Sequence, residues 1–200
     1  MTDDETVDEL FRMAGRCLGQ WSAIEYALAD LFLSLHGQKP YANNKLRAVF
    51  ETVQSLDIRL AMLKVSAELS MNDDQGFQES YKKLHEKIRE SSRKRNQTAH
   101  FALVRTEGRA RDKIRLHPFY TPSGSYNGTN KDGLSIKQLQ EMRASFVILN
   151  DCAIYLSWYV QIRLGIAIPA VQNLANPERL IHTQPTFTAE ELASLPQNRP

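Results

Sequence analysis

The sequence predicts a mainly all-α protein: a bundle of four to five helices with one short inserted β-hairpin. Two long segments repeat apolar residues at alternating spacings of three and four, the pattern of a helix with one buried face. A third helical segment is strongly basic, and only one stretch alternates as a strand pair does. We expect a helical domain over residues 1–169 and an extended or disordered tail over 170–200, where Asn, Pro, Gln and Thr dominate.

The composition is that of one globular domain rather than a membrane or secreted protein. The chain has 200 residues, of which 42% are hydrophobic and 24% are charged. No apolar run approaches the length that crosses a bilayer, and the acidic start Asp3-Asp4-Glu5 is unlike a signal peptide. We therefore expect a cytoplasmic location and no membrane partner.

Neither the cysteines nor the histidines indicate a metal or redox centre. Cys17 and Cys152 lie on the apolar faces of the two longest helical segments, where a thiol most often serves as a small buried hydrophobic group. The chain has no C-x-x-C or H-E-x-x-H spacing. We expect no disulfide, no metal and no cofactor.

The first long helix is expected over residues 3–35. Acidic residues at its start suit the positive end of the helix dipole, and Gly37 follows its end. Trp21 and Glu25 lie one turn apart, which is typical of a core aromatic residue beside a salt bridge; a place for Glu25 in a functional cleft is the alternative. The apolar stripe of this helix is Leu10, Met13, Cys17, Trp21, Ile24, Leu28, Leu31 and Leu35.

Two shorter helices are expected next, over residues 45–50 and 55–70. Leucine and alanine residues give the second of them an inward face. Arg47 and Arg59 are expected to join a basic surface.

A basic helix follows over residues 74–94, after a turn and cap at Asn72-Asp73-Asp74. It has lysine and arginine residues on much of its surface. Its predicted buried residues are Phe77, Tyr81, Leu84 and Ile88.

The hairpin is expected over about 101–119, and a polar, glycine-rich mobile loop over 121–134. Ser135 and Gln138 then form a capping box at the start of the last long helix. Its apolar surface is wider than one partner helix needs, so it would pack on the first helix with one side and on a second protomer with the other; a wholly intramolecular core is the default alternative. Its stripe is Leu139, Met142, Phe146, Leu149, Ala153, Leu156 and Val160.

The most informative stretch is Arg95-Asn96-Gln97-Thr98-Ala99-His100 at the end of the basic helix. Residues five apart are rotated by about 140° on a helix, so Arg95 and His100 converge only if the helix ends between them or a second copy lies opposite. Weak helix formers precede the motif and strand formers follow it, so we expect the helix to end near Arg95. An arginine fork holds phosphate oxygens and a histidine transfers protons near neutral pH, so this pair suits a phosphodiester without metal.

This stretch resembles the motif of the HEPN superfamily, in which an arginine is followed by a polar residue, often Asn, and then by a histidine. The resemblance implies metal-independent RNA cleavage at a site formed across a homodimer, in a toxin or phage-defence protein with an antitoxin or regulatory protein as a partner. It implies that Arg95 holds the scissile phosphate and that His100 acts as general acid or base around the ribose 2′-hydroxyl and the leaving oxygen. By the same resemblance, Asn96 orients one of them.

Positive charge is concentrated around this motif. From Lys82 to Arg115 the chain has twelve Lys or Arg against four Asp or Glu, whereas the whole chain has a net charge of only +2. Such a concentration suits RNA or another polyanion, although a solvated helix face is the alternative. The RNA-binding candidates are Lys87, Arg93, Lys94, Arg105, Arg111 and Lys113.

Two other functions fit the same residues. One is a HEPN-like module that binds RNA or a nucleotide without cleaving it. The other is a structural helical interaction protein in which Arg95 and His100 pair with local carboxylates. Cleavage in EDTA, salt-sensitive binding without cleavage, or neither result distinguishes the three functions.

Overall fold

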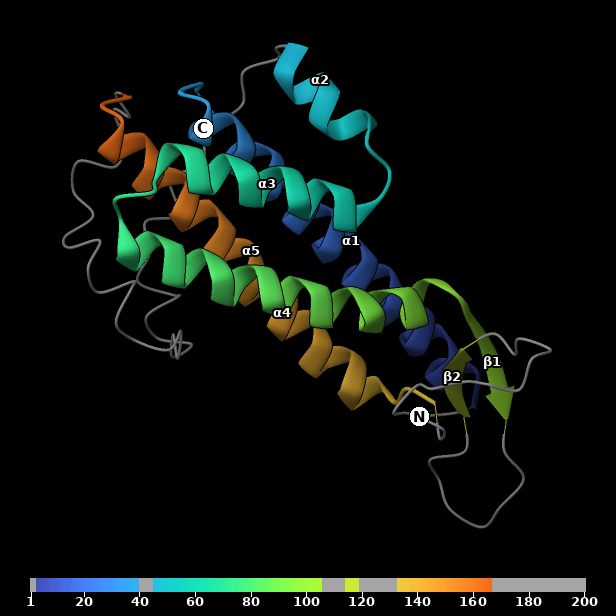
Figure 1. Ribbon diagram of the computed structural model, residues 1–200. Helices are drawn as coiled ribbons and strands as arrows, with labels where there is room; N and C mark the ends of the chain where they lie inside the picture. Colours follow the sequence, from blue (N-terminus) through green and yellow to red (C-terminus); the bar gives the residue numbers. More distant parts are fainter. Residues whose placement is uncertain (1–2, 40–44, 106–113, 119–132, 167–200) are drawn as a thin grey trace.

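The fold is an elongated helical bundle with a two-stranded hairpin at one end (Figure 1). The computed structural model describes residues 3–39, 45–105, 114–118 and 133–166. Within these residues the predicted mainly helical bundle with an inserted hairpin is confirmed. The elements are α1 (Asp3–Leu35), α2 (Lys45–Thr52), α3 (Leu56–Ser70), α4 (Gln75–Ala99), β1 (Phe101–Arg105), β2 (Ile114–Pro118) and α5 (Ile136–Arg163).

The long helices α1 and α5 lie side by side and form the centre of the bundle. They run in the same direction, because Cys17 Sγ donates to the Leu139 carbonyl oxygen and, further along both helices, the hydroxyl oxygens of Ser34 and Ser157 are 2.8 Å apart. Every residue of the predicted α1 stripe is buried. Of the predicted α5 stripe, all but Leu156 are buried, and Leu156 packs against the core.

Helices α3 and α4 form a hairpin across this central pair, joined by a turn that ends at Asp74. One carboxylate oxygen of Asp74 caps α4 by accepting from the Phe77 N–H at 2.9 Å, and the other accepts from the Tyr159 hydroxyl at 2.5 Å. The same carboxylate therefore joins the start of α4 to the end of α5. The four residues predicted to be buried in this helix, from Phe77 to Ile88, are all buried.

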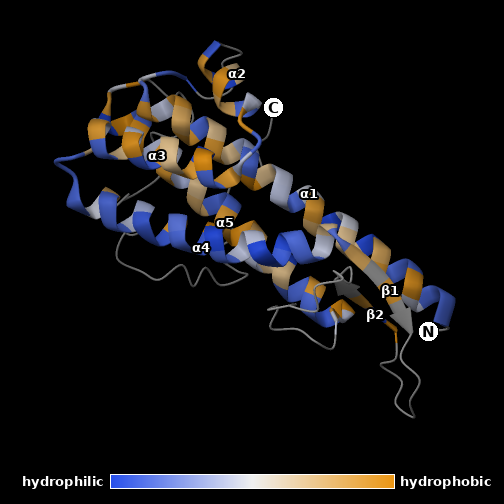
Figure 2. Cartoon of the chain, turned by 45° about the vertical axis from the view of Figure 1, so that its right-hand side comes forward, coloured by the Kyte–Doolittle hydropathy of each residue, from blue (hydrophilic) through white to orange (hydrophobic). Residues whose placement is uncertain are grey.

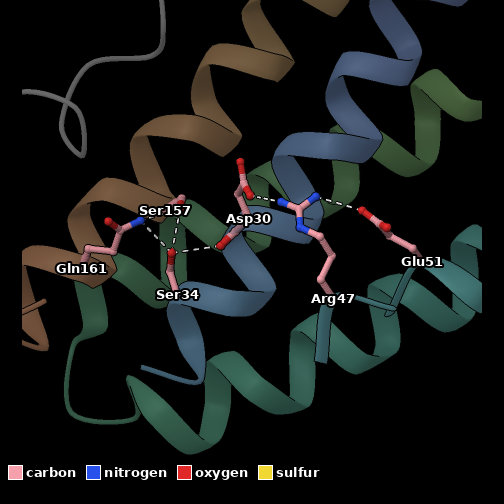
Figure 3. A network of polar contacts seen from close by, with 6 residues as sticks. All are labelled: Asp30, Ser34, Arg47, Glu51, Ser157 and Gln161. Carbon is pink, nitrogen blue, oxygen red and sulfur yellow. Dashed lines mark hydrogen bonds and ion pairs between the residues drawn. The ribbon is translucent and has the colours of Figure 1, made fainter. Parts of the chain in front are cut away.

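Arg47 and Arg59 face the bundle rather than the basic surface, which corrects the expectation from the sequence. Arg47 is only 7% exposed because its guanidinium pairs with the buried carboxylate of Asp30 on α1 (Figure 3). Arg59 lies 3.7 Å from the carboxylate of Glu25, which also accepts from the Trp21 indole at 2.8 Å. Glu25 thus has the predicted role of a salt-bridge partner beside a core tryptophan.

The hairpin packs on the end of the bundle where α1 and α5 begin. Strands β1 and β2 are antiparallel, with Leu103 opposite Leu116. Leu116 also exchanges two backbone hydrogen bonds with Leu134, at 3.1 and 2.8 Å, immediately before α5. The predicted capping box of Ser135 and Gln138 then starts α5. Leu134 was expected in a mobile loop, but this backbone pairing holds it and buries it against the hairpin.

Some expectations concern residues outside the described part of the chain. These are the hairpin turn over 106–113, most of the predicted loop at 121–132, and the tail over 170–200. Among the residues that are described, no helix is both long and apolar enough to span a membrane. Both cysteines are free thiols.

Candidate functional site

Helix α4 continues through the motif, so the expected helix end near Arg95 is wrong. The helix runs to Ala99, and His100 is its C-terminal cap. Thr98 explains the extension, because this residue is 0% exposed and its hydroxyl lies 3.6 Å from Met142 Sδ on α5. The same hydroxyl donates to the Lys94 carbonyl oxygen at 3.0 Å. Packing on α5 therefore outweighs the weak helix propensity of the residues before Arg95.

Arg95 lies on the inward side of α4, in line with the buried residues Ile88, Ser91 and Thr98. Its side chain is partly buried, and its Nε–H is buried without a hydrogen-bond acceptor among the described residues. A buried donor without an acceptor is unfavourable by about 1–3 kcal/mol, and more when the group is charged. The Nε–H of Arg95 is closed to solvent, so an anionic oxygen would have to approach the other end of the guanidinium, where Nη1 lies.

The other end of the Arg95 guanidinium holds Asn96. Nη1 of Arg95 donates to Oδ1 of Asn96 at 3.0 Å. Since arginine has only donors, the oxygen of the Asn96 amide must face it, and the NH₂ group is turned away. Asn96 is exposed, so this arrangement presents a neutral donor to solvent.

His100 is exposed at the end of α4, and its backbone N–H donates to the Asn96 carbonyl oxygen at 3.0 Å. Asn96 and His100 are four residues apart and share one side of the helix. Arg95 and His100 are rotated by about 140°, and no hydrogen bond joins these two residues within one protomer. The structure thus brings Arg95 to Asn96 and places Asn96 beside His100, but it does not bring Arg95 to His100.

The basic surface of α4 is divided into two flanks. Lys82, Arg89 and Arg93 fall on the same side of the helix as Asn96 and His100, within about 60° of one another around the axis. We call this side the Arg93 flank. A second side, about 120° further around the helix axis, is formed by Lys83, Lys87 and Lys94, and we call it the Lys87 flank. All six of these basic residues are exposed, and most of α4 is hydrophilic in the view of Figure 2.

An acidic ridge separates the two flanks. Exposed glutamates Glu79, Glu86 and Glu90 project outward between them, within about 40° of one another. Glu90 lies 3.0 Å from Lys87 and 3.9 Å from Lys94, both on the Lys87 flank. The hydrogen bond from Lys87 lowers the pKa of Glu90, so this carboxylate stays ionised and offsets the charge of that flank.

The remaining RNA-binding candidates lie in or beside the hairpin. Arg105 belongs to β1, where its backbone is paired in register with Ile114 of β2. Arg111 and Lys113 lie outside the described residues. The structure therefore places only Lys87, Arg93 and Lys94 of these candidates on α4, and it puts them on two different flanks.

One exposed aromatic residue near the motif was missed from the sequence. Phe11 on α1 is 48% exposed, and its ring centroid lies 5.7 Å from that of Phe101, the residue after His100. Phe11 immediately follows Leu10 of the buried stripe. An aromatic residue one position off an apolar stripe is the signal that would have identified it.

Comparison with known proteins does not identify a function for this chain. No family model, no curated protein and no solved structure matches this chain. Within the described part of the chain, no group of three or more His, Cys, Asp or Glu side chains is arranged to hold a metal ion. The chemistry of Arg95, Asn96 and His100 is therefore the basis of the functional argument.

Proposed function

We propose that this protein is a HEPN-like, metal-independent endoribonuclease that acts as a homodimer. The observation that carries the proposal is the state of Arg95, whose buried Nε–H lacks an acceptor among the described residues while its Nη1 holds Asn96. The donor that Asn96 presents and the exposed His100 lie one helical turn apart on α4. These groups provide anion binding and proton transfer, which are the two requirements of phosphodiester cleavage.

The reaction follows from the chemistry of RNA. The ribose 2′-oxygen loses its proton to a base and forms a bond to phosphorus, while the bond from phosphorus to the 5′-oxygen breaks. The leaving oxygen takes a proton from an acid, and the products carry a cyclic phosphate and a 5′-hydroxyl. Arg95 would hold the phosphate oxygens and stabilise their developing charge, and Asn96 would add a neutral hydrogen bond.

A second protomer would bring a His100 side chain to Arg95, which one protomer alone does not do. Because α4 stays helical from Arg95 to Ala99, the positions of Arg95 and His100 are rotated by about 140° from one another within one chain. A two-fold axis at this end of α4 would place Arg95 and Asn96 of one protomer opposite His100 of the other. His100 of the second protomer would then act as the general acid or base of that site.

Cleavage in EDTA tests this proposal. Purified protein and its His100→Ala variant are incubated with single-stranded and structured RNA, and the product ends are identified. The proposal requires cyclic-phosphate ends from the wild-type protein and no cleavage by the folded variant. Equal inertness of both proteins, or equal cleavage by both, would remove the assignment.

Binding without cleavage is the second candidate function. The separation of Arg95 from His100 in one protomer favours it if no dimer forms. In that case RNA or a nucleotide would bind to the same residues in a salt-sensitive way and remain intact. A role in a toxin–antitoxin or phage-defence system, with a protein that controls the nuclease, belongs to the first proposal only.

A further inference from the structure

We infer that single-stranded RNA runs along the Arg93 flank of α4, from His100 past Arg93 towards Arg89, and does not contact the Lys87 flank. This inference rests on the proposed function, because it takes His100 as the point where the RNA is cut. It assigns a path and a set of phosphate contacts to the substrate. It also removes two of the α4 lysines, Lys87 and Lys94, from the binding surface.

The basic residues of the two flanks differ in how many of them form ion pairs with carboxylates. On the Lys87 flank, two of the three lysines lie within 4 Å of Glu90. On the Arg93 flank, Arg93 and Lys82 form no ion pair with any residue in the described part of the chain, and Arg89 lies 3.5 Å from the exposed Asp57. A polyanion binds through phosphates that displace counterions from lysine and arginine, so the flank with fewer ion pairs is the stronger site.

The acidic ridge prevents one strand from using both flanks. Glu79, Glu86 and Glu90 project outward between them, and a phosphate backbone crossing this ridge would meet like charges. The RNA must therefore follow one side of α4. We assign the RNA to the Arg93 flank, because His100 and Asn96 both lie on it.

The arrangement of the helices leaves the motif end of this flank open. Asp57, at the start of α3, pairs with Arg89, so α3 lies beside α4 at that level. Beyond Arg89, α4 continues to Ala99 past the start of α3, as Figure 1 shows. Arg93, Asn96 and His100 are all exposed on this projecting part of the helix.

The spacing on this part of α4 suits a chain of phosphates rather than a single anion. Arg93 and His100 are seven residues apart, which is about 10.5 Å along the helix axis. Arg93 therefore contacts a phosphate next to the one that is cut, and the bidentate fork of its guanidinium fixes the position of the strand. Asn96, between them, lies one turn from His100.

Two adjacent residues on different flanks provide the test. Arg93→Gln and Lys94→Gln each remove one positive charge from an exposed side chain, and each is made in the His100→Ala background so that the RNA stays intact. Affinity for a fluorescent single-stranded oligonucleotide is measured by anisotropy over a range of salt concentrations. We expect Arg93→Gln to weaken binding about three- to tenfold and to reduce the salt slope by about 0.7, the value for one neutralised phosphate of a single strand. We expect Lys94→Gln to change neither quantity.

The outcomes separate this inference from the proposed function. If both variants weaken binding equally, or if only Lys94→Gln does, the Arg93 path is wrong, while cleavage by the wild-type protein would still support the nuclease. The oligomeric state of each variant is measured by sedimentation. If Arg93→Gln changes the oligomeric state, but binds RNA as tightly as the parent protein when the same oligomer is compared, the path is also wrong. If the wild-type protein neither binds nor cleaves RNA, the proposed function itself fails.

Discussion

Nη1 of Arg95 donates to Oδ1 of Asn96 at 3.0 Å, and this bond fixes which end of the Asn96 amide faces solvent. The amide oxygen is held by the arginine, and the NH₂ group faces solvent on the side of α4 that also carries His100. One hydrogen bond between neighbours in the sequence therefore gives Arg95 and Asn96 a common orientation. This relationship links the inward side of α4 to the side on which His100 lies.

Substitution of Asn96 tests the orientation. Asn96→Ala removes the outward donor, and we expect a moderate loss of cleavage, about tenfold, equivalent to about 1.4 kcal/mol of transition-state stabilisation. Asn96→Asp puts a carboxylate where the proposed nuclease would bind a phosphate and pairs it with Arg95, so the loss should be larger although the fold is not weakened. Cleavage rates and urea midpoints are measured for both variants. An aspartate variant more active than the alanine variant would contradict the assignment.

The buried ion pair of Asp30 and Arg47 joins α2 to the central pair (Figure 3). Asp30 is 5% exposed and Arg47 is 7% exposed, so Asp30→Ala leaves a buried guanidinium with Glu51, at 2.8 Å, as its remaining carboxylate partner among these residues. Breaking a buried pair costs about 3–5 kcal/mol, and we expect a loss near the lower end of this range because Glu51 remains. Urea unfolding measures the effect.

The matching control is the double variant Asp30→Leu/Arg47→Met. It removes both charges together, and we expect it to be more stable than Asp30→Ala alone. A single variant that loses less than about 1 kcal/mol would show that the pair does not hold α2 in place.

Asp74 makes two different contributions with its two carboxylate oxygens. Asp74→Ala removes the cap of α4 and the acceptor of the Tyr159 hydroxyl, and we expect a loss of about 2 kcal/mol. Asp74→Asn keeps an effective cap and should lose less than Asp74→Ala. Tyr159→Phe removes only the hydroxyl bond and leaves Arg163 of α5 3.4 Å from the same carboxylate oxygen, so it should cost about 1 kcal/mol. Equal stability of Asp74→Ala and the wild-type protein would exclude this dual role.

Both cysteines should be unreactive in the folded protein. Burial raises the pKa of Cys17 to about 11 and that of Cys152 to about 11, so little thiolate is present at pH 8. We expect slow alkylation of native protein and rapid alkylation of both thiols in urea. Because the folded state disfavours the thiolate, stability should fall as the pH rises from about 8.5, the ordinary cysteine value, towards 11. Native labelling at the rate of a free thiol would show that one site is open.

Local signals in the sequence predicted most of the helical framework. The apolar stripes predicted α1 and α5. Asp74 predicted the start of α4, and the pair of Ser135 and Gln138 predicted the start of α5. Each signal lies within a few residues of the feature that it specifies, because caps and stripes act over one or two helical turns.

The predictions that were wrong concern features that depend on contacts between residues far apart in the sequence. The end of α4 depends on Thr98 packing against Met142, which lies 44 residues further along the chain. The helix propensities of the residues around Thr98 do not reveal this contact. The burial of Arg47 depends in the same way on Asp30 of another helix. The two flanks of α4 follow from the sequence only once the helix is known to reach Ala99, because only then do Arg93 and His100 share a side.

Complementation between two inactive variants is the most direct test of the two-protomer site. Arg95→Ala and His100→Ala chains are co-expressed with different tags, and the mixed dimers are purified and assayed for RNA cleavage in EDTA. In a mixed dimer one site keeps Arg95 from one chain and His100 from the other, so we predict about half of the wild-type activity per dimer. Each variant alone should be inactive. Mixed dimers that remain as inactive as the separate variants would contradict a site shared between protomers.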